Sequence, residues 1–243
     1  MNLKKDAYGQ GIWAYFNGKE SYELIERDDG FVDFSTGSPN YFAKFKNWPK
    51  IQKDGMKFVK GKVLDVGVGA GRVPLYLQKK GFDVLAIDNS PLAIRVCKKI
   101  GVKKARVFPI EEINKFKPKT FNTVIMYGNN FGLFGNFKKA KSLLKKFNKI
   151  TTDDALIIAE TCDPYNTKDP VHLSYQKRNR SKGRMSGRLR IRVRFRNYVG
   201  EWFNYLLVSQ KEMKQILKGT GWKIKKFINS SGAMYVAIIE KEK

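Results

Sequence analysis

The sequence predicts an α/β protein built on a doubly wound, mostly parallel sheet with an antiparallel final strand. Three observations predict this fold class. Short, continuous apolar segments, typical of strands buried on both faces, recur between residues 62 and 159. Amphipathic segments alternate with them, as strand–helix–strand units require. A glycine-rich stretch stands where the first of these strands passes into a helix.

Local signals place the elements of the alternating region. Ser90 followed by Pro91 begins a helix, and Gly81 and Gly101 each end one. Apolar residues at helical spacing predict a long helix over 137–150. The predicted strands are 62–66, 83–87, 105–110, 123–127 and 155–159, and the predicted helices are 73–80, 90–100 and 137–150.

The end of the chain returns to regular structure after an irregular insertion. Ser209 and Glu212 form a capping box that opens a helix running to Lys218. Strands follow at 222–228 and 234–239. The turn between them is short, so they form an antiparallel hairpin. These signals predict an aromatic-rich N-terminal cap over 1–60 and a core over 61–243, with a basic β-hairpin insertion at about 164–208, after the fifth strand. Ser21 to Ile25 is expected to form a helical turn.

Composition excludes several classes of protein. Of the 243 residues, 42% are hydrophobic, which is enough for a core and rules out a wholly disordered chain. No apolar run reaches the roughly 20 residues of a membrane span. The N-terminus lacks the apolar region of a secretory signal, so a cytoplasmic protein without membrane association is expected. Two cysteines (Cys97, Cys162) and one histidine (His172) leave no disulfide scaffold and no expected metal site.

Positive charge is the unusual feature of the composition. Lys and Arg total 48 against 22 acidic residues, a net charge of +26. Such a surface attracts anions, nucleic acid among them. The lysines are spread over nearly every segment, so a general compositional bias is the competing explanation. The arginines are different, because most of them lie between Arg178 and Arg196.

Part of this arginine cluster has the pattern of a strand. Five arginines alternate with apolar residues from Arg188 to Arg196, which gives one arginine face and one apolar face. Residues 202–208 are expected to pair with it. Arginine grips carboxylates and phosphates with two hydrogen bonds, so Arg192 and Arg194 are predicted substrate ligands, together with Tyr175. The alternative is a solvated edge strand protected by charge.

The strongest functional signal is the glycine loop with its acidic partner. Glycines at 67, 69 and 71 let the chain turn sharply and approach a ligand, at the N-terminus of a helix. Asp88 ends the next strand, 21 residues after Gly67, where a carboxylate reaches ribose hydroxyls. The spacing is not that of a dinucleotide fingerprint, because Arg72 occupies the place of its third glycine. No Gly-Lys-Ser or Gly-Lys-Thr ending of a phosphate loop is present.

At these residues the chain resembles class I S-adenosylmethionine-dependent methyltransferases, whose sheet is Rossmann-like. The segments that carry the resemblance are 65–71, 88–91, 108–111, 121–128 and 219–222. The resemblance implies S-adenosylmethionine as cofactor. It implies that the three glycines lie against its methionine and ribose, that Asp65 orients the loop or approaches the amino group, and that Asp88 accepts from the ribose hydroxyls. The further implied cofactor residues are Arg72, Asn89, Ser90, Ile110, Glu111, Gly128 and Asn129.

Methyl transfer is an in-line displacement, so the protein must align the acceptor, exclude water and in some reactions remove a proton. No fixed triad is needed or visible. Ligands of such sheets bind beyond the carboxyl ends of the strands. The candidate catalytic residues there are Asn130, Glu160 and Asp163, with His172 in an expected irregular segment of the insertion. For each of them a structural role is the alternative.

The sequence predicts an enzyme, a methyltransferase for a small, anionic acceptor. The alternative is an RNA methyltransferase whose basic insertion holds phosphates. A protein methyltransferase or a non-catalytic cofactor-binding module is the further alternative. Gly128-Asn129-Asn130-Phe131 differs from the Asn/Asp-Pro-Pro-aromatic motif of enzymes that methylate exocyclic amines of bases. The acceptor and its reacting atom, any general base and the oligomeric state stay open.

Overall fold

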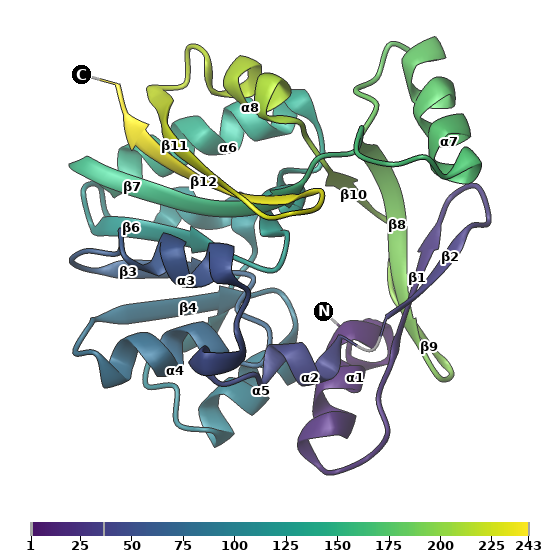
Figure 1. Cartoon of the computed structure of the whole chain (residues 1–243). Helices are drawn as coiled ribbons and strands as arrows, with labels where there is room; N and C mark the ends of the chain where they lie inside the picture. Colours follow the sequence, from purple (N-terminus) through teal and green to yellow (C-terminus); the bar gives the residue numbers. More distant parts are fainter. Residues whose placement is uncertain (1, 36, 243) are drawn as a thin grey trace. The chain divides into compact units, whose positions relative to one another are not determined.

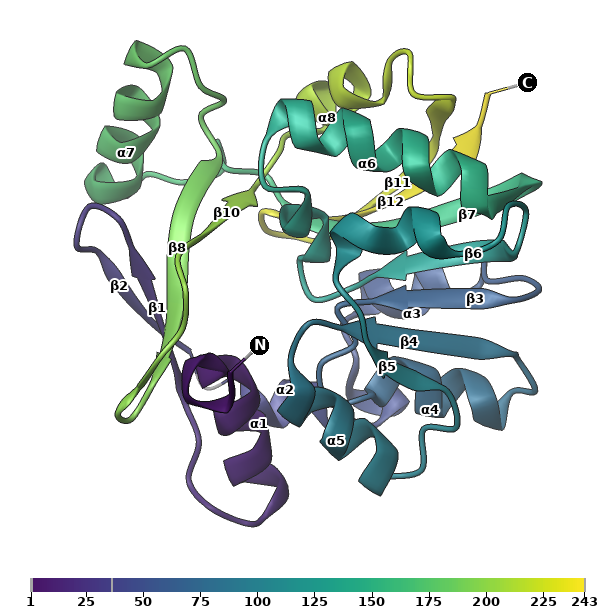
Figure 2. The same ribbon diagram turned by 180° about the vertical axis from the view of Figure 1, so that it is seen from behind.

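The protein forms two β-sheets with helices around them, seen in a computed structural model that describes residues 2–35 and 37–242 (Figures 1 and 2). The larger sheet has seven strands in the order β11-β12-β7-β6-β3-β4-β5. The smaller sheet has the order β10-β8-β1-β2, with β9 paired to β8. Consecutive strands such as β3 and β4 are joined through helices, as a doubly wound sheet requires.

The helices of the described residues are mostly short. The α-helices are α1 (Ala7–Phe16), α2 (Ser38–Tyr41), α3 (Lys50–Met56), α4 (Arg72–Lys79), α5 (Pro91–Lys99), α6 (Phe137–Ile150), α7 (Pro170–Ser181) and α8 (Gln210–Leu217). The 3-10 helices are η1 (Leu3–Lys5), η2 (Phe45–Asn47), η3 (Ile110–Lys115) and η4 (Asn130–Phe134). Within residues 2–35 and 37–242, no helix combines the length and apolar character needed to cross a bilayer.

The strands of the alternating region overlap their predicted positions, although β5 ends at Val107 rather than at Ile110, where η3 begins. The strands are β1 (Glu23–Arg27), β2 (Val32–Ser35), β3 (Val63–Val66), β4 (Val84–Asp88), β5 (Ala105–Val107), β6 (Phe121–Met126), β7 (Thr151–Cys162), β8 (Arg188–Phe195), β9 (Tyr198–Val199), β10 (Phe203–Leu206), β11 (Trp222–Asn229) and β12 (Met234–Lys241). β7 is much longer than predicted, because polar residues at its start continue the pairing with β6.

The chain divides into two compact units, each assembled from separated segments. Unit 1 comprises the residues up to Trp48, Leu64–Ile110 and Arg190–Phe203. Unit 2 comprises Pro49–Val63, Glu111–Leu189 and the residues from Asn204 onward. Most of the predicted N-terminal cap therefore belongs to the same unit as the glycine loop.

Unit 2 contains the antiparallel closure of the larger sheet. β6 and β7 are parallel, and β12 runs antiparallel to both β7 and β11, which confirms the predicted antiparallel final strand. α3 lies on one face of these strands and α6 and α8 on the other (Figures 1 and 2). The predicted capping box is present: Ser209 and Glu212 bond each other's backbone N–H at the start of α8.

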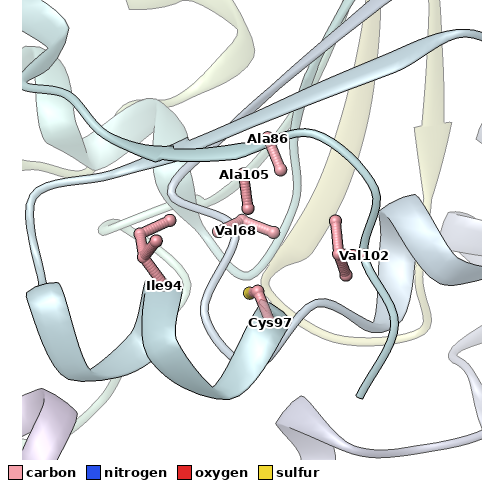
Figure 3. Close-up of a cluster of buried hydrophobic side chains, with 6 residues drawn as sticks. All are labelled: Val68, Ala86, Ile94, Cys97, Val102 and Ala105. Atoms are coloured by element: carbon pink, nitrogen blue, oxygen red, sulfur yellow. The ribbon is translucent and has the colours of Figure 1, made fainter. Parts of the chain in front are cut away.

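Unit 1 holds the glycine loop against a small apolar core. β4 and β5 are parallel, and α5 joins them and packs on both. Buried side chains from the loop, both strands and α5 form the cluster of Figure 3, namely Val68, Ala86, Ile94, Cys97, Val102 and Ala105. A Cβ on Gly71 would lie 2.9 Å from Val102 and 3.1 Å from the Cys97 sulfur, so glycine is needed there for packing as well as for its φ of +91°.

Two local predictions were wrong. The helical turn expected at Ser21–Ile25 is instead the start of strand β1, because Glu23 to Ile25 pair with β2, and Leu24 and Ile25 also pair with β8. The segment around His172 is helix α7 rather than irregular, with Asp169 as its N-cap and Pro170 in its first turn. Asp169 and Pro170 are local start signals for α7 that sequence reasoning missed, whereas β1 pairs both with the nearby β2 and with the distant β8.

The predicted arginine strand is present as β8. Its neighbours show whether it is a solvated strand at the edge of a sheet. It pairs with β9 in a hairpin, with Arg194 opposite Val199, and β10 lies within the expected partner segment. β8 also pairs with β1 and so lies inside its sheet. The alternative of a solvated edge strand is therefore wrong.

Candidate cofactor and acceptor site

The glycine loop leaves β3 and is tied to the neighbouring strand by its backbone. The N–H groups of Gly67 and Val68 both donate to the carbonyl of Ile87, at 2.9 and 3.1 Å. Gly67, Gly69 and Gly71 have φ of +74°, +58° and +91°. L-residues with side chains rarely adopt these values, so the loop conformation depends on the glycines.

Asp88, at the end of β4, is linked to this loop. Its Oδ2 accepts from the Gly69 N–H at 3.1 Å and its Oδ1 from the Ser90 N–H at 2.9 Å. Burial raises the pKa of Asp88 to about 6, although these hydrogen bonds favour the charged form. Asn89 beside it is exposed, while Ser90 is buried and caps α5. The structure thus brings together a carboxylate and a glycine loop that were predicted to share a ligand.

Asp65, on β3, is a second buried carboxylate of this unit. It is 2% exposed, and its Oδ2 has no hydrogen-bond partner within the described part of the chain. Burial raises its pKa to about 7, opposed by the charge of Arg72. Arg72 begins α4 with its guanidinium 4.6 Å above the Trp48 ring, so it packs between the helix and η2. A buried carboxylate oxygen without a hydrogen-bond donor can accept a hydrogen bond from a ligand.

Sequence reasoning missed the part that α1 plays at this loop. Asp6 Oδ2 accepts from the Ser90 hydroxyl at 2.8 Å and from the Leu92 N–H at 3.2 Å, at the start of α5. The Tyr8 hydroxyl lies 3.0 Å from the position of a Cβ on Gly69. α1 thus packs on α5 and on the glycine loop (Figure 2). Only the aromatic richness of residues 1–60 hinted at such packing.

A third buried carboxylate, Glu23 of β1, was also missed. The Tyr41 hydroxyl donates to its Oε2 at 3.2 Å, and the Tyr41 ring stands edge-on to Tyr8, with ring centroids 5.5 Å apart. Glu23 is 4% exposed, and among the described residues nothing bonds its Oε1. Burial raises its pKa to about 7. No motif marks Glu23 in the sequence, because its hydrogen-bond partner Tyr41 lies 18 residues away.

Unit 2 places Gly128 and Asn129 in a rigid turn after β6. Glu160, on β7, is 3% exposed and accepts from the Gly128 N–H at 2.6 Å and the Asn129 N–H at 3.4 Å. Gln52 donates to both oxygens of Glu160. The Tyr205 hydroxyl donates to the Asn129 carbonyl at 2.5 Å. Both Glu160 oxygens are therefore engaged in hydrogen bonds, and those to Gly128 and Asn129 hold this turn.

The other predicted site residues of unit 2 differ in burial and in hydrogen bonding. Asn130 begins η4 and is half-buried. Asp163, after β7, accepts from the Tyr165 N–H at 2.9 Å in a turn. His172 is half-exposed on α7 with Asp169 4.0 Å away, and Tyr175 is buried beneath Arg178.

The predicted adenine contacts differ in exposure. Ile110 is half-buried at the start of η3, directly after β5. Glu111 is exposed and forms an ion pair with Lys139 at 2.5 Å. Ile110 can therefore make an apolar contact, whereas Glu111 is a surface carboxylate paired with Lys139.

The two arginines predicted to hold a substrate are engaged within unit 1. Arg192 makes two hydrogen bonds to Glu26 of β1, both at 2.8 Å, and Arg194 makes one at 3.3 Å. The Arg192 guanidinium also lies 4.6 Å above the Trp202 ring. The strand pairing of β1 with β8 places Glu26 opposite Arg192. Glu26 thus neutralises part of the arginine face.

Comparison with known proteins agrees with this arrangement. A family model described as a methyltransferase domain matches residues 42–226, so the chain belongs to that family. A SAM-dependent methyltransferase from Bacteroides fragilis, solved with S-adenosyl-L-homocysteine, has a TM-score of 0.84 at 24% identity, covering 100% of this chain and 98% of its own. One from Methanosarcina mazei has a TM-score of 0.61 at 18% identity, covering 76% and 95%. The predicted family and fold class are therefore confirmed, and with them S-adenosylmethionine as the donor that the family uses.

A curated relative adds a further similarity. The tRNA (uracil(54)-C(5))-methyltransferase of Pyrococcus horikoshii is 28% identical over 144 residues, which make up 57% of this chain and 33% of that protein. The chain thus spans about a third of the length of this relative.

The residues of unit 1 fit S-adenosylmethionine. Its ribose diol needs a carboxylate acceptor, and Asp88 supplies one beside the loop. Its amino group needs an acceptor, and Asp65 has an unpartnered oxygen. A side chain on Gly69 would crowd Tyr8, so the backbone there stays accessible to a ligand only as glycine.

Proposed function

We propose that this protein transfers a methyl group from S-adenosylmethionine to a small-molecule acceptor. The observation that carries the proposal is the hydrogen bond from the Gly69 N–H to Asp88 Oδ2. It joins the glycine loop to the one carboxylate of β4, the pair that a ribose and a methionine chain require together. The family and the fold support the same donor.

The roles of the cofactor residues follow from their chemistry. Asp88 accepts from the ribose hydroxyls, with Asn89 and Ser90 beside it. Gly67, Gly69 and Gly71 let the backbone approach the methionine chain, and Asp65 accepts from its amino group. Ile110 packs on the adenine. When bound, the cofactor supplies a methyl carbon that is already electrophilic, so the chain's own residues need to align the acceptor and exclude water.

Unit 2 contributes a fixed turn rather than a proton acceptor. Glu160 and Tyr205 hold the backbone of Gly128 and Asn129. A turn held at both of its ends keeps its side chains in one orientation, as substrate alignment requires. Asn130 and Asp163 remain proposed acceptor contacts. The exposure of His172 at the helix surface favours a structural role for it.

A small acceptor is favoured by the burial around the glycine loop. The Tyr8 hydroxyl lies 3.0 Å from the position of a Cβ on Gly69, and the Tyr8 ring packs on Tyr41, which bonds the buried Glu23. A nucleotide within a folded RNA would need an open surface or base extrusion. The anionic character predicted for the acceptor is no longer supported by Arg192 and Arg194, since Glu26 already pairs with both.

The second candidate is an RNA methyltransferase. It is supported by the net charge of +26 and by the similarity to a tRNA methyltransferase over part of the chain. Methyl transfer from labelled S-adenosylmethionine to a fractionated lysate separates the two. Label that survives nuclease and protease supports a small acceptor, and label that is lost with nuclease alone supports RNA.

A further inference from the structure

Glu23 is a buried carboxylate with a structural role for only one of its oxygens. Tyr41 bonds Oε2, while Oε1 is buried without a partner. Leaving a buried acceptor unsatisfied is destabilising, more so when the acceptor is charged. A ligand that donates a hydrogen bond would remove this cost.

The position of Glu23 connects it to the glycine loop. Tyr41 contacts both Glu23 and the region of Gly69, where its ring atoms lie 3.6–3.9 Å from a Cβ position. Tyr8 lies 3.0 Å from the same position by its hydroxyl. A chain of hydroxyl and carboxylate groups thus leads from the loop that contacts the methionine part of the donor to Glu23.

Four buried carboxyl groups surround this neighbourhood and bear on which acceptor it could bind. Asp6, Glu23, Asp65 and Asp88 are all buried in unit 1, with at most 7% of each exposed. An anionic acceptor would be repelled by these carboxylates, whereas a group that donates hydrogen bonds or becomes positive during the reaction would be stabilised.

We propose that Glu23 binds the nucleophilic nitrogen of the methyl acceptor, with Tyr41 and Tyr8 completing the polar contacts, and that the acceptor is a small amine. This inference rests on the proposed function and names its substrate class. In the step it implies, the amine nitrogen forms a bond to the methyl carbon while the carbon–sulfur bond breaks and its electron pair stays on sulfur. The proton released from nitrogen passes to the Glu23 carboxylate, directly or through the Tyr41 hydroxyl.

The test uses two probes of the same shape and opposite chemistry, benzylamine and benzoate. Their binding to protein saturated with S-adenosylhomocysteine is measured by ligand-observed NMR. We expect benzylamine to bind at least fivefold more tightly than benzoate. Glu23→Gln should weaken benzylamine binding at least tenfold, and Tyr41→Phe at least threefold. Glu20→Gln, an exposed glutamate three residues before Glu23, is the matched control and should change it less than twofold.

Calorimetry with S-adenosylhomocysteine separates failure of this inference from failure of the proposed function. If the unaltered protein does not bind S-adenosylhomocysteine, the proposed function fails. If it binds, absence of benzylamine binding, equal binding of benzoate, or binding indifferent to both Glu23→Gln and Tyr41→Phe overturns the amine assignment alone. A tenfold loss of S-adenosylhomocysteine affinity in Glu23→Gln would place Glu23 at the cofactor and also overturn it.

Discussion

At the scale of single residues, unit 1 is distinguished by buried carboxylates with raised pKa values. Asp65, Asp88 and Glu23 are nearly inaccessible to water, and burial raises the pKa of each above its ordinary value. Buried carboxylates with raised pKa values are concentrated at functional sites, where a bound ligand can donate the hydrogen bond that the protein does not provide. Their different partners separate their roles: Asp88 is bonded by two backbone N–H groups, whereas Asp65 and Glu23 each keep an unpartnered oxygen.

Replacing Asp88 should weaken cofactor binding. Asp88→Asn removes the charge that the ribose hydroxyls bond, and a hydrogen bond to a charged group contributes about 1.5–3 kcal/mol, or roughly 10- to 150-fold in affinity. Calorimetry with S-adenosylhomocysteine measures the loss. Asp83→Asn, an exposed carboxylate just before the same strand, is the control. Unchanged affinity in a folded Asp88 variant would remove Asp88 from the site.

Glu23 should make stability depend on pH. Its pKa is about 7 in the folded protein and near 4.5 in the unfolded chain, so the folded state holds this proton more tightly. Its stabilising contribution is complete below about pH 4.5 and is lost as the pH rises through 7. Glu23→Gln, which resembles the protonated acid, should match the unaltered protein at pH 4.5 and exceed its stability at pH 8 by about 2–3 kcal/mol.

Urea denaturation of the ligand-free protein at several pH values between 4.5 and 8 measures this difference. Asp65 and Asp88 titrate over the same range, but they are present in both proteins, so their contributions cancel in the comparison. A difference in unfolding free energy that does not grow with pH would mean that Glu23 is not buried as a carboxylate.

At the scale of elements, the N-terminal ends of α1 and α5 are linked by Asp6, next to the glycine loop. Asp6 caps α1 by accepting from the Gly9 N–H at 3.0 Å, and its other oxygen bonds Ser90 and Leu92 at the start of α5. One carboxylate thus joins two helix N-termini next to Asp88. This contact makes α1 part of the same unit as the glycine loop and Asp88, which are proposed to bind the cofactor.

Asp6→Ala should therefore affect stability and binding together. Loss of the two caps should lower the unfolding free energy by about 1–3 kcal/mol. Displacement of Ser90 next to Asp88 should lower S-adenosylhomocysteine affinity at least threefold. Asn136→Ala removes only the cap of α6 and should cost about 1 kcal/mol without changing affinity. Equal affinities of all three proteins would show that α1 is a structural cap alone.

The alternating elements and the glycine loop were predictable because their signals are local. Ser90 with Pro91 and the Ser209 capping box mark helix starts wherever they occur, and both were found where expected. Glu23 and Tyr8 were not predictable as site residues, because their function depends on packing between segments far apart in the sequence. The second sheet was missed for a similar reason: besides its nearby partner β2, β1 pairs with β8, more than 160 residues away in the sequence.

Charge is the property that acts over the whole molecule. The excess of 26 positive charges creates a field that draws in any polyanion, whether or not it is a substrate. Part of the arginine face is neutralised by Glu26, and exposed lysines pair with acidic residues elsewhere, as Lys119 does with Asp153. Binding of RNA alone therefore cannot identify the acceptor, and the salt dependence of the reaction is the more informative quantity.

Salt should separate the two candidate functions. A protein that holds RNA through six to ten phosphate contacts loses roughly 10³- to 10⁵-fold in affinity between 50 and 200 mM salt. A small amine held in a buried site by Glu23 makes no phosphate contact, and charges that are buried are screened little. We therefore expect the rate of methyl transfer at low acceptor concentration to change less than threefold over this range, while binding of bulk RNA falls steeply. The measurement is label transfer to the active lysate fraction at both salt concentrations, with and without nuclease. A transfer rate that falls in parallel with RNA binding, and disappears with nuclease, would instead establish RNA as the acceptor and assign the positive surface to substrate binding.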